Sequence, residues 1–495
     1  MKKMLRSFAG FCAAVLVLGT ARLALGQTCT VDWNDVHQRI DGFGASSAFS
    51  GRTWSQATAT TFFSTNSGLG LSLLRNQIQP GGFASASELS LMTNVGAFGA
   101  KVWSAPWTPQ ASFKDNNSTI GGNFLSASNQ AYASQLAGYV ANLKNNYGLN
   151  IYAVSIQNEP DANVGYVSCF WTSSQLASFV TNFYQALVLS NVASTKIMLP
   201  ESENWDDPQG LAFDTMNDPK AAADVGILAN HNYVNDNTVG DTNPPDVVPN
   251  YGKALWETEV ATLGGTFDPS ITNAMYWAQR IHLFLTIPEV NAWHYWWLIT
   301  GNGDNEGLMG HDSTGDLPTK RMYVVGQYSR FVRPGYYRMG ATNTGDALIS
   351  AYQDTNSVSF AIVAINTNTT DINQTFTLKN FAATTVTTWI TSSSLSLSNQ
   401  ASFNVSGSSF SYTLPAMSVV TFVGHASPVL SASAQNRNLL LSWPTNTSGF
   451  QLMFTTNLGK PVWAPAPGTP VKIGGQFVVT NVMTNRTEFF RIMKP

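Results

Sequence analysis

The sequence predicts an α/β fold: a (β/α)8 TIM barrel, an associated side β-sandwich and a small C-terminal β-sandwich module. Three observations predict it. From about residue 38 to 335, short apolar runs alternate with longer segments of helical period, as in βα units that build a parallel sheet. Residues 336–425 alternate instead as short strands rich in Ser, Thr and Asn, which is typical of an antiparallel β-domain. At 495 residues, the chain is also too long for one ordinary domain.

Residues 1–26 read as a secretory signal peptide. Lys2, Lys3 and Arg6 form a basic start, residues 8–18 are apolar, and residues 24–26 resemble a small-residue cleavage site. The apolar run is too short for a transmembrane helix, and no later segment offers 18 uncharged apolar residues. We therefore expect a secreted, extracellular protein with no membrane partner.

The barrel domain is predicted to span residues 27–335, with residues 28–38 joining either the barrel or the side domain. Eight strands are expected in it: Arg39–Ala45, Leu71–Ile78, Lys101–Pro106, Ile151–Asn158, Lys196–Pro200, Val225–His231, Lys253–Glu259 and Val290–Trp297. Helical stretches between them include Asn129–Asn146, Trp171–Leu189 and Ile271–Leu285. The active site of such a barrel lies at the C-terminal ends of its strands.

The side domain is predicted over residues 336–425 and the C-terminal module over residues 426–495. Strands expected in the side domain are Leu348–Tyr352, Ser357–Ile365, Gln374–Leu378, Thr385–Ile390, Ser409–Leu414 and Val419–Val423. Those of the module are Asn438–Trp443, Phe450–Thr455, Lys472–Val479 and Glu488–Ile492. The sequence does not indicate what the module does.

Composition excludes several classes of partner. The net charge is −3, only 11% of residues are charged, and no basic stripe suggests nucleic acid. The six His are scattered and form no Cys/His cluster, so no metal and no other cofactor is predicted. Cys29 and Cys169 are far apart in the sequence and are expected to be unpaired. We expect a monomer that acts on a polysaccharide.

Two strand ends carry the carboxyl groups that glycosidic cleavage needs. Glu159 follows the apolar run 151–156, and Glu259 ends the seventh strand. The two exits lie across the barrel mouth, and a retaining enzyme holds its carboxyl groups about 5–5.5 Å apart. This predicts Glu159 as the proton donor and Glu259 as the nucleophile. Glu257 lies two residues deeper, where a charge would be costly unless paired.

Polar residues at other strand ends are predicted to support this pair. Arg75 would hydrogen-bond the nucleophile and keep it ionised, or else form a structural ion pair. Asn158 would donate to the sugar 2-hydroxyl, and Tyr233 would hold Glu259 in position. Glu201 is expected in a supporting or substrate-contacting role. Aromatic side chains would form the floor of the sugar subsites, or pack the top of the barrel; these are Trp107, Trp296 and Trp297.

Four ordered motifs within residues ~30–425 resemble glycoside hydrolase family 30, on its xylanase branch. The motifs are Ile40–Ser46, Val154–Asp161, Leu255–Glu259 and Gln327–Tyr336. The resemblance implies a retaining clan A mechanism on a barrel with a side β-domain, Glu159 as acid/base and Glu259 as nucleophile. It also implies endo-cleavage of β-1,4-xylan, often steered by a glucuronic acid branch.

One departure from this family concerns the glucuronate branch. Family members specific for glucuronoxylan carry an Arg after the eighth-strand Trp-Trp, whereas residues 298–306 here contain two acids and no Arg. We therefore do not expect dependence on the branch. Arg52, in the loop after the first strand, is either a substitute or a plain surface residue.

Two other functions remain open from sequence alone: another family 30 β-glycosidase (β-1,6-glucanase or glucosylceramidase-like), and a non-catalytic carbohydrate-binding protein. The last ~70 residues lie outside the resemblance, and both glycan binding and surface attachment are open for them.

Overall fold

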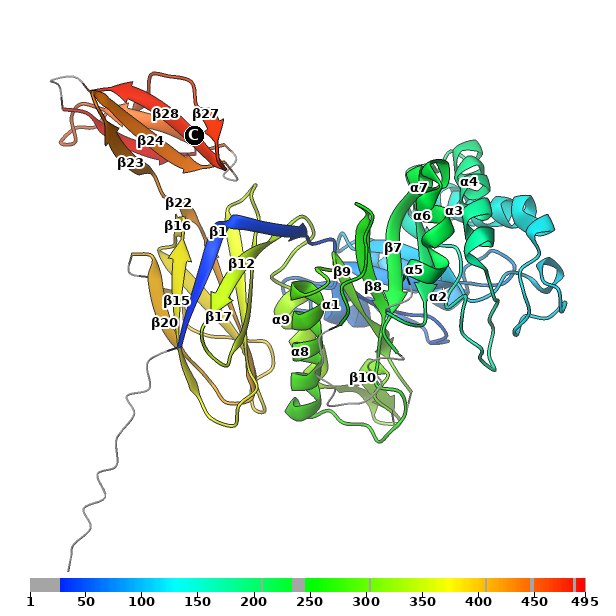
Figure 1. Ribbon diagram of the computed structural model, residues 1–495. Helices are drawn as coiled ribbons and strands as arrows, with labels where there is room; N and C mark the ends of the chain where they lie inside the picture. Colours follow the sequence, from blue (N-terminus) through cyan, green and yellow to red (C-terminus); the bar gives the residue numbers. More distant parts are fainter. Residues whose placement is uncertain are drawn as a thin grey trace, which may run out of the picture.

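The computed structural model describes residues 27–205, 208–233, 245–301, 304–405, 407–445, 449–483 and 487–494. The predicted signal peptide lies outside the described residues. Figure 1 shows the barrel with its helices, the side β-domain next to it, and the C-terminal module, drawn in orange and red, beyond the side domain.

The barrel is a closed sheet of eight parallel strands, which confirms the predicted fold class. Neighbouring strands pair in sequence order, and β9 pairs with both β8 and β2, so the sheet has no free edge between its first and last strands. The strands are β2 (Gly42–Ser46), β3 (Leu73–Ile78), β4 (Lys101–Pro106), β5 (Ile151–Ser155), β6 (Lys196–Ser202), β7 (Val225–His231), β8 (Ala254–Glu259) and β9 (Ala292–Ile299).

Helices cover the outer face of these strands. They are α1 (Gln56–Phe63), α2 (Ala86–Gly96), α3 (Asn129–Tyr147), α4 (Ser173–Leu189), α5 (Pro208–Leu211), α6 (Phe213–Asn217), α7 (Pro219–Asp224), α8 (Ile271–Thr286) and α9 (Lys320–Ser329). Local sequence sets their ends. Thr172 and Gln175 form a reciprocal capping box at the start of α4, and Gly148 ends α3 in the left-handed conformation. Because helices cover one face and the packed interior the other, the strands read as continuous apolar runs.

A hairpin that sequence analysis did not predict extends the barrel sheet beside β9. It consists of β10 (Gly307–Asp312) and β11 (Gly315–Pro318), and β10 runs parallel to β9. This hairpin brings His311 and Asp316 to the rim of the barrel mouth.

The side domain is a ten-stranded curled sheet around its own hydrophobic core. Its strands are β1 (Gln27–Arg39), β12 (Tyr337–Asn343), β13 (Leu348–Gln353), β14 (Ser359–Asn366), β15 (Ile372–Lys379), β17 (Thr385–Thr391), β18 (Ser398–Asn399), β19 (Phe403–Asn404), β20 (Ser409–Leu414) and β21 (Ser418–His425). The N-terminal β1, blue in Figure 1, lies between β12 and β15 and buries Cys29, Val31 and Trp33. Its pairing with β15 is parallel, which differs from the expected antiparallel arrangement. The difference arises because β1 reaches this sheet from the start of the chain and not through a hairpin.

The barrel and the side domain are joined through α9, which packs against β17 and β21. The Thr421 hydroxyl donates to the carbonyl of Gln327 at 2.9 Å, and the guanidinium of Arg330 lies 4.5 Å from the ring centre of Trp389. These contacts explain why the motif that spans residues 327–336 belongs to the fold and not to the barrel mouth.

The C-terminal module has two small sheets that pack around Leu441, Trp443, Leu452 and Val479. One sheet contains β23 (Ser431–Gln435), β24 (Asn438–Pro444), β28 (Gln476–Val482) and β27 (Val471–Ile473); the other contains β26 (Ala464–Pro465), β25 (Gln451–Thr455) and β29 (Phe489–Met493). The single strand expected over residues 472–479 is therefore wrong. Gly474 and Gly475 both adopt positive φ, 54° and 77°, and make the two-residue turn of a hairpin there.

The module meets the side domain at a short junction. Strand β22 (Ser427–Pro428) pairs with β16 (Phe381–Ala382), and the Lys494 ammonium donates to the carbonyl of Asn356 at 2.7 Å. Cys29 and Cys169 are both buried and free. Among the described residues, no helix is long and apolar enough to cross a membrane.

Replacing Gly44 with Ala should destabilise the barrel, because an added Cβ would meet the ring of His294 and lie 2.8 Å from the backbone oxygen of Leu73. We expect a loss of roughly 1–3 kcal/mol in the free energy of unfolding, measured by denaturant titration. Gly138→Ala is the matched control, since Gly138 is exposed within α3 and its added Cβ would meet nothing within 4 Å. It should stabilise by about 0.5–1 kcal/mol. Equal effects would contradict this account of the packing.

Candidate active site

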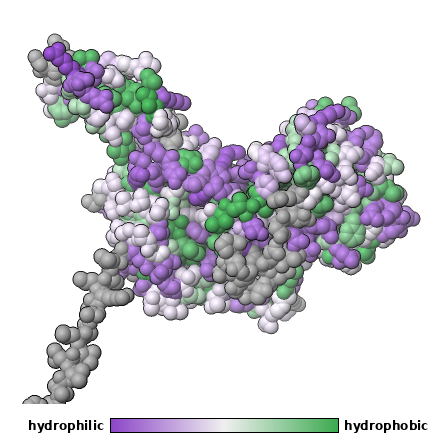
Figure 2. Space-filling model, in the orientation of Figure 1, coloured by the Kyte–Doolittle hydropathy of each residue, from purple (hydrophilic) through white to green (hydrophobic). Residues whose placement is uncertain are grey.

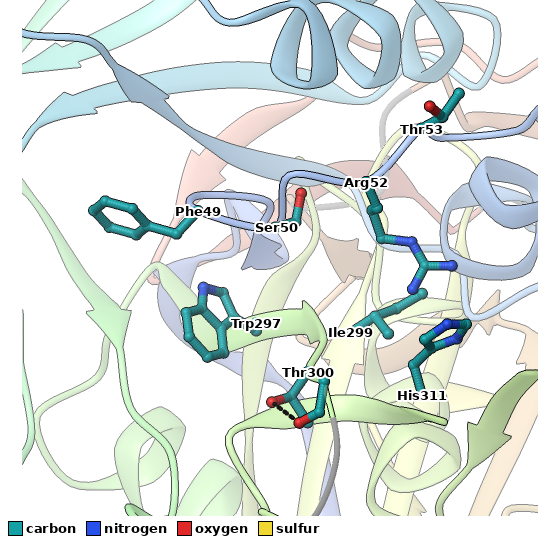
Figure 3. A pocket seen from close by; sticks show the side chains of 9 residues that line it. Phe49, Ser50, Arg52, Thr53, Trp297, Ile299, Thr300 and His311 are labelled. Atoms are coloured by element: carbon teal, nitrogen blue, oxygen red, sulfur yellow. Dashed lines mark hydrogen bonds between the residues drawn. The ribbon is translucent and has the colours of Figure 1, made fainter. Parts of the chain in front are cut away.

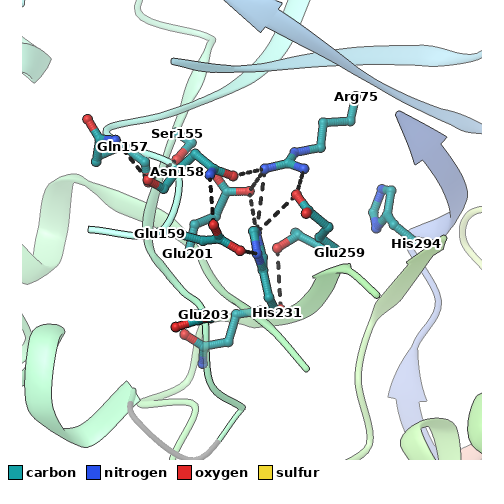
Figure 4. Close-up of polar contacts among 12 residues, drawn as sticks. Arg75, Ser155, Gln157, Asn158, Glu159, Glu201, Glu203, His231, Glu259 and His294 are labelled. Carbon is teal, nitrogen blue, oxygen red and sulfur yellow. Dashed lines mark hydrogen bonds and ion pairs between the residues drawn. The ribbon is translucent and has the colours of Figure 1, made fainter. Parts of the chain in front are cut away.

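The polar groups predicted from the strand ends converge at the barrel mouth (Figure 4). Arg75 comes from β3, His231 from the end of β7 and Glu259 from the end of β8, while Glu159 follows β5 by four residues. All four side chains are buried or nearly so. In Figure 4, His231 lies between Glu159 and Glu259.

Glu159 is held by its backbone as well as by its side chain. Its φ is +43°, a left-handed conformation that non-glycine residues rarely adopt, and its N–H donates to the carbonyl of Glu201 at 2.9 Å. The carboxylate accepts from the Tyr166 hydroxyl at 2.8 Å and faces Nδ1 of His231 at 2.9 Å. These contacts fix the position of the Glu159 carboxyl group at the mouth of the barrel, although the residue lies in a loop.

Glu259 is held by donors on both of its oxygens. Arg75 donates to one oxygen through Nη1, and the Tyr233 hydroxyl donates to the other at 3.1 Å. The second guanidinium nitrogen, Nη2, donates to Oδ1 of Asn158 at 2.6 Å and to Glu201 at 2.9 Å. Since Oδ1 of Asn158 accepts from Arg75, the amide nitrogen is the group that can donate; one of its N–H groups points to Glu159 at 3.4 Å, and the second is left for a ligand.

The distance between the two carboxyl groups decides what this pair can do. One oxygen of Glu159, one oxygen of Glu259 and a ring nitrogen of His231 all lie within 4.8 Å of one another. Inverting glycosidases leave about 6.5–9.5 Å between their carboxyl groups to accommodate a water molecule, whereas retaining enzymes need about 5–5.5 Å. The observed separation fits direct attack on the sugar.

The two other glutamates near the site have different surroundings. Burial raises the pKa of Glu257 to about 8, and its oxygens accept from the backbone N–H groups of Glu259 and His294. Glu257 therefore links the end of β8 to the first part of β9 below the cleft. Glu201 is fully buried between Arg75 and His231, which is a supporting position.

His231 carries the second positive charge of the site. Burial lowers its pKa, but Glu259, Glu159 and Glu201 outweigh burial and raise the pKa to about 10. Its Nδ1 faces Glu159, while its Nε2 lies 3.4 Å from Glu201 and 3.6 Å from Glu259. Arg75 and protonated His231 together balance most of the charge of three buried carboxyl groups.

The pKa values of Glu159 and Glu259 are shifted in opposite directions. Burial raises the pKa of Glu159, but the hydrogen bond and charge of His231, with help from Tyr166 and Arg75, bring it below its usual value. Burial also raises the pKa of Glu259, and there the opposing charges of His231 and Arg75 do not outweigh it.

Aromatic side chains form the walls of the cleft. A pocket at the mouth contains both carboxyl groups and is lined by Phe49, Trp107, Glu159, Tyr166, Glu203, Tyr233, Glu259, Leu263, Trp296, Trp297 and Glu306. The Arg75 guanidinium lies 4.6 Å from the ring centre of Trp107, so this ring contacts the charged cluster from the cleft side. Trp296 and Trp297 stack with ring centres 4.9 Å apart.

Arg52 lies outside this cleft, in a second pocket beside it (Figure 3). The two pockets share Phe49 and Trp297, and His311 from β10 completes the second one. Arg52 forms an ion pair with Asp316 of β11 at 3.0 Å.

Sequence analysis did not predict Tyr166 or Phe49, and it placed His231 with Tyr233 among the polar residues at the strand ends without giving His231 a specific role. The structure adds the role of His231, whose ring lies between Glu159 and Glu259. Tyr166 and Phe49 lie in loops after strands, where neither periodicity nor motif spacing predicts the direction of a side chain.

Glu159, His231 and Glu259 are also the residue types that bind metal ions. Here each ring nitrogen of His231 faces a carboxylate, and Glu259 already accepts from Arg75 and Tyr233. Glu159, His231 and Glu259 therefore all have hydrogen-bond or ion-pair partners within the protein, which is the arrangement expected of a proton-transfer site.

A closed barrel with paired carboxyl groups at its mouth defines a glycoside hydrolase of the retaining type. Known proteins agree. The chain is 32% identical to glucuronoxylanase XynC of Bacillus subtilis (strain 168) over 422 residues, which cover 82% of this chain and 93% of the relative. No family model matches the sequence.

Solved structures match over similar lengths. The family 30 subfamily 8 xylanase Xyn30A of Clostridium acetobutylicum is 34% identical with a TM-score of 0.71, covering 80% of this chain and 99% of that one. A GH30 endoxylanase of Clostridium papyrosolvens C71 is 31% identical with a TM-score of 0.67, covering 80% and 100%. The chain belongs to glycoside hydrolase family 30, which confirms the resemblance seen in its motifs.

The pKa of His231 provides a direct test of the charged cluster. We expect the ring to remain protonated at pH 8, observed by ¹⁵N NMR of histidine-labelled protein, with His231→Gln identifying the signal. Because the folded pKa is raised, the stabilisation from this group is fully present below pH 6.5 and is lost as the pH rises through about 10. A titration midpoint below pH 7 would contradict the charge balance described above.

Proposed function

We propose that this chain is a secreted, retaining endo-β-1,4-xylanase that hydrolyses xylan by double displacement. The observation that carries the proposal is the approach of Glu159 and Glu259 within 4.8 Å across the barrel mouth. The chain needs no cofactor for this chemistry, because both groups that react with the substrate are side chains.

In the first step, Glu159 gives its proton to the glycosidic oxygen while the Glu259 carboxylate attacks the anomeric carbon. The bond to the leaving sugar breaks and an ester to Glu259 forms. Donors from Arg75 and Tyr233 favour the ionised nucleophile. A sugar that fills the cleft removes water from Glu159 and favours its neutral, proton-donating form.

In the second step, Glu159 takes a proton from water, the water oxygen attacks the anomeric carbon, and the Glu259 carboxylate leaves. While Glu259 is an ester it carries no negative charge. Losing that charge lowers the pKa of Glu159, because two nearby carboxylates raise each other's pKa. The same residue is thereby suited to act first as acid and then as base.

Xylan is the substrate that sequence identity supports. The relatives above 30% identity are named glucuronoxylanase and xylanase. An endo-β-1,6-glucanase, BT3312, shares the fold at 20% identity and a TM-score of 0.64, which supports no substrate. An intact cluster of Arg75, His231 and two carboxyl groups also favours an enzyme over a relict binding protein.

Export and a monomeric state belong to the same proposal. Export rests on the basic, apolar and small-residue segments of residues 1–26. Detection of the chain, shortened by about 26 residues, in the medium of its expression host would support export, and retention of the full-length chain in the cell would contradict it.

Replacing either carboxyl group should abolish turnover. Glu259→Gln and Glu159→Gln are each expected to lower kcat on xylan by about 10³-fold or more, since each removes a group that one of the two steps requires. Asp214→Asn, an exposed carboxylate on α6, is the control and should leave kcat unchanged. The assignment is wrong if either glutamine variant keeps most of its activity.

Azide separates the two roles. With an activated aryl xyloside, Glu259→Gly should yield the α-glycosyl azide, because azide attacks in place of the missing nucleophile. Glu159→Gly should yield the β-glycosyl azide, because azide then attacks the glycosyl-enzyme. If Glu259→Gly gave the β-azide and Glu159→Gly gave the α-azide, Glu159 would be the nucleophile and Glu259 the acid/base.

We further propose that a glucuronate branch is tolerated in the Arg52 pocket but is not required. Four glutamates line the central cleft and disfavour a uronate there, whereas Arg52 and His311 line the neighbouring pocket. The ion pair with Asp316 already offsets the charge of Arg52, so we expect a moderate contribution from the branch.

The ratio of kcat/KM on glucuronic-acid-branched and unbranched xylo-oligosaccharides tests this pocket. Arg52→Gln should lower the ratio about three- to tenfold, and Asp316→Asn should raise it, because Asn frees the Arg52 charge while keeping a hydrogen-bond acceptor. If the wild-type enzyme cleaves only branched substrate, the branch is required and this proposal is wrong. If the ratio is unchanged in both variants, the Arg52 pocket does not bind the glucuronate branch.

A further inference from the structure

The C-terminal module differs in charge from the rest of the chain. Residues 426–495 contain six Lys and Arg residues and one Glu, a formal net charge of +5. Residues 27–425 contain 16 Lys and Arg residues against 28 Asp and Glu residues, a net charge of −12. An acidic polymer is therefore repelled by the catalytic part and attracted by the module at its end.

One face of the module presents a cation and an aromatic ring together. Leu452, Phe490 and Ile492 of β25 and β29 point into the module's core, so Arg491 points outward from the same sheet. Its guanidinium lies 4.0 Å from the ring centre of half-buried Trp463, which precedes β26 in the same sheet. In the orientation of Figure 2, the module presents hydrophilic and hydrophobic residues side by side.

Arg491 is well placed to receive an anion. It is exposed, and its Nη2 contacts the Met493 sulfur, a weak acceptor, at 3.1 Å. Among the residues that the structure describes, no carboxylate pairs with it; the module's single acid, Glu488, accepts from Asn481 instead. A guanidinium stacked on an indole keeps its N–H groups in the plane of the fork, where they bind a carboxylate in two places.

We propose that the Arg491–Trp463 face of the module binds an acidic, uronate-bearing polysaccharide. Arg491 pairs with the uronate carboxylate, and Trp463 offers the edge and exposed face of its ring to the neighbouring sugar. The remaining module cations, Lys460 among them, add long-range attraction. This inference rests on the proposed function for the identity of the polymer, since the substrate of the barrel is a xylan that carries such branches.

A uronate polymer fits this face better than other polyanions. Lipid surfaces and nucleic acids favour clusters of cations, whereas here a single stacked Arg lies beside an aromatic ring. The module also extends from the side domain of a polysaccharide hydrolase, so the polymer that the barrel cleaves is present wherever the module is.

The test compares two affinities of the full-length protein: one for soluble glucuronoxylan, and one for the same polymer after chemical reduction of its carboxyl groups. The protein carries Glu259→Gln, so that it does not hydrolyse the polymer during the measurement. We expect at least fivefold tighter binding to the unreduced polymer, weakening between 0.05 and 0.5 M salt. Arg491→Gln and Trp463→Ala should each remove most of this preference. Arg437→Gln, which removes the same charge elsewhere in the module, should change affinity less than twofold.

Several outcomes would overturn the site. These are equal binding of the two polymers, equal effects of Arg491→Gln and Arg437→Gln, or tighter Arg491-dependent binding to phosphatidylglycerol vesicles or DNA. Hydrolysis of short unbranched xylo-oligosaccharides separates this result from the proposed function. It should be unchanged by Arg491→Gln, and its absence in the wild type would refute the xylanase proposal without touching the module's binding.

Discussion

The arrangement of the barrel mouth depends on the burial of three carboxyl groups beside two cations. Glu159, Glu201 and Glu259 meet Arg75 and protonated His231 in a space with almost no access to water. A buried charge without a partner is strongly destabilising. Loss of one charged side chain from this cluster would therefore leave another one unpaired and lower the stability of the fold. This constraint holds the two central carboxyl groups closer than their mutual repulsion would otherwise allow.

The barrel supplies the geometry that this cluster requires. Parallel strands direct their C-terminal ends to one rim, and residues from five different strands or their exits can therefore converge there. Two of them, Glu159 and Glu201, adopt left-handed backbone conformations at φ of +43° and +56°. Such conformations at non-glycine residues persist where the surrounding contacts determine them, and here the N–H of Glu159 donates to the carbonyl of Glu201.

Much of this could be predicted from sequence, for physical reasons. The buried strands appear as apolar runs, and Glu159 and Glu259 lie at or just after the ends of two of them, so the barrel and the carboxyl pair were both predictable. The place of β1 in the side sheet was left open, because the sequence of a single strand does not determine which strands it pairs with. Tyr166 reaches Glu159 from a loop, and Phe49 lines the cleft from another. Their positions depend on tertiary packing that spacing along the chain does not encode.

The division of charge along the chain complements this site. Four glutamates line the cleft, and the cations outside its charged cluster include Arg52 in the neighbouring pocket and the Lys and Arg residues of the C-terminal module. The proposed mechanism depends on direct attack of Glu259 on the anomeric carbon. The anomeric configuration of the first product tests this attack most directly. Proton NMR of xylan hydrolysis, recorded before the new reducing ends mutarotate, should show the β-anomer formed first. Initial formation of the α-anomer would mean that water attacks directly, and would contradict Glu259 as a nucleophile.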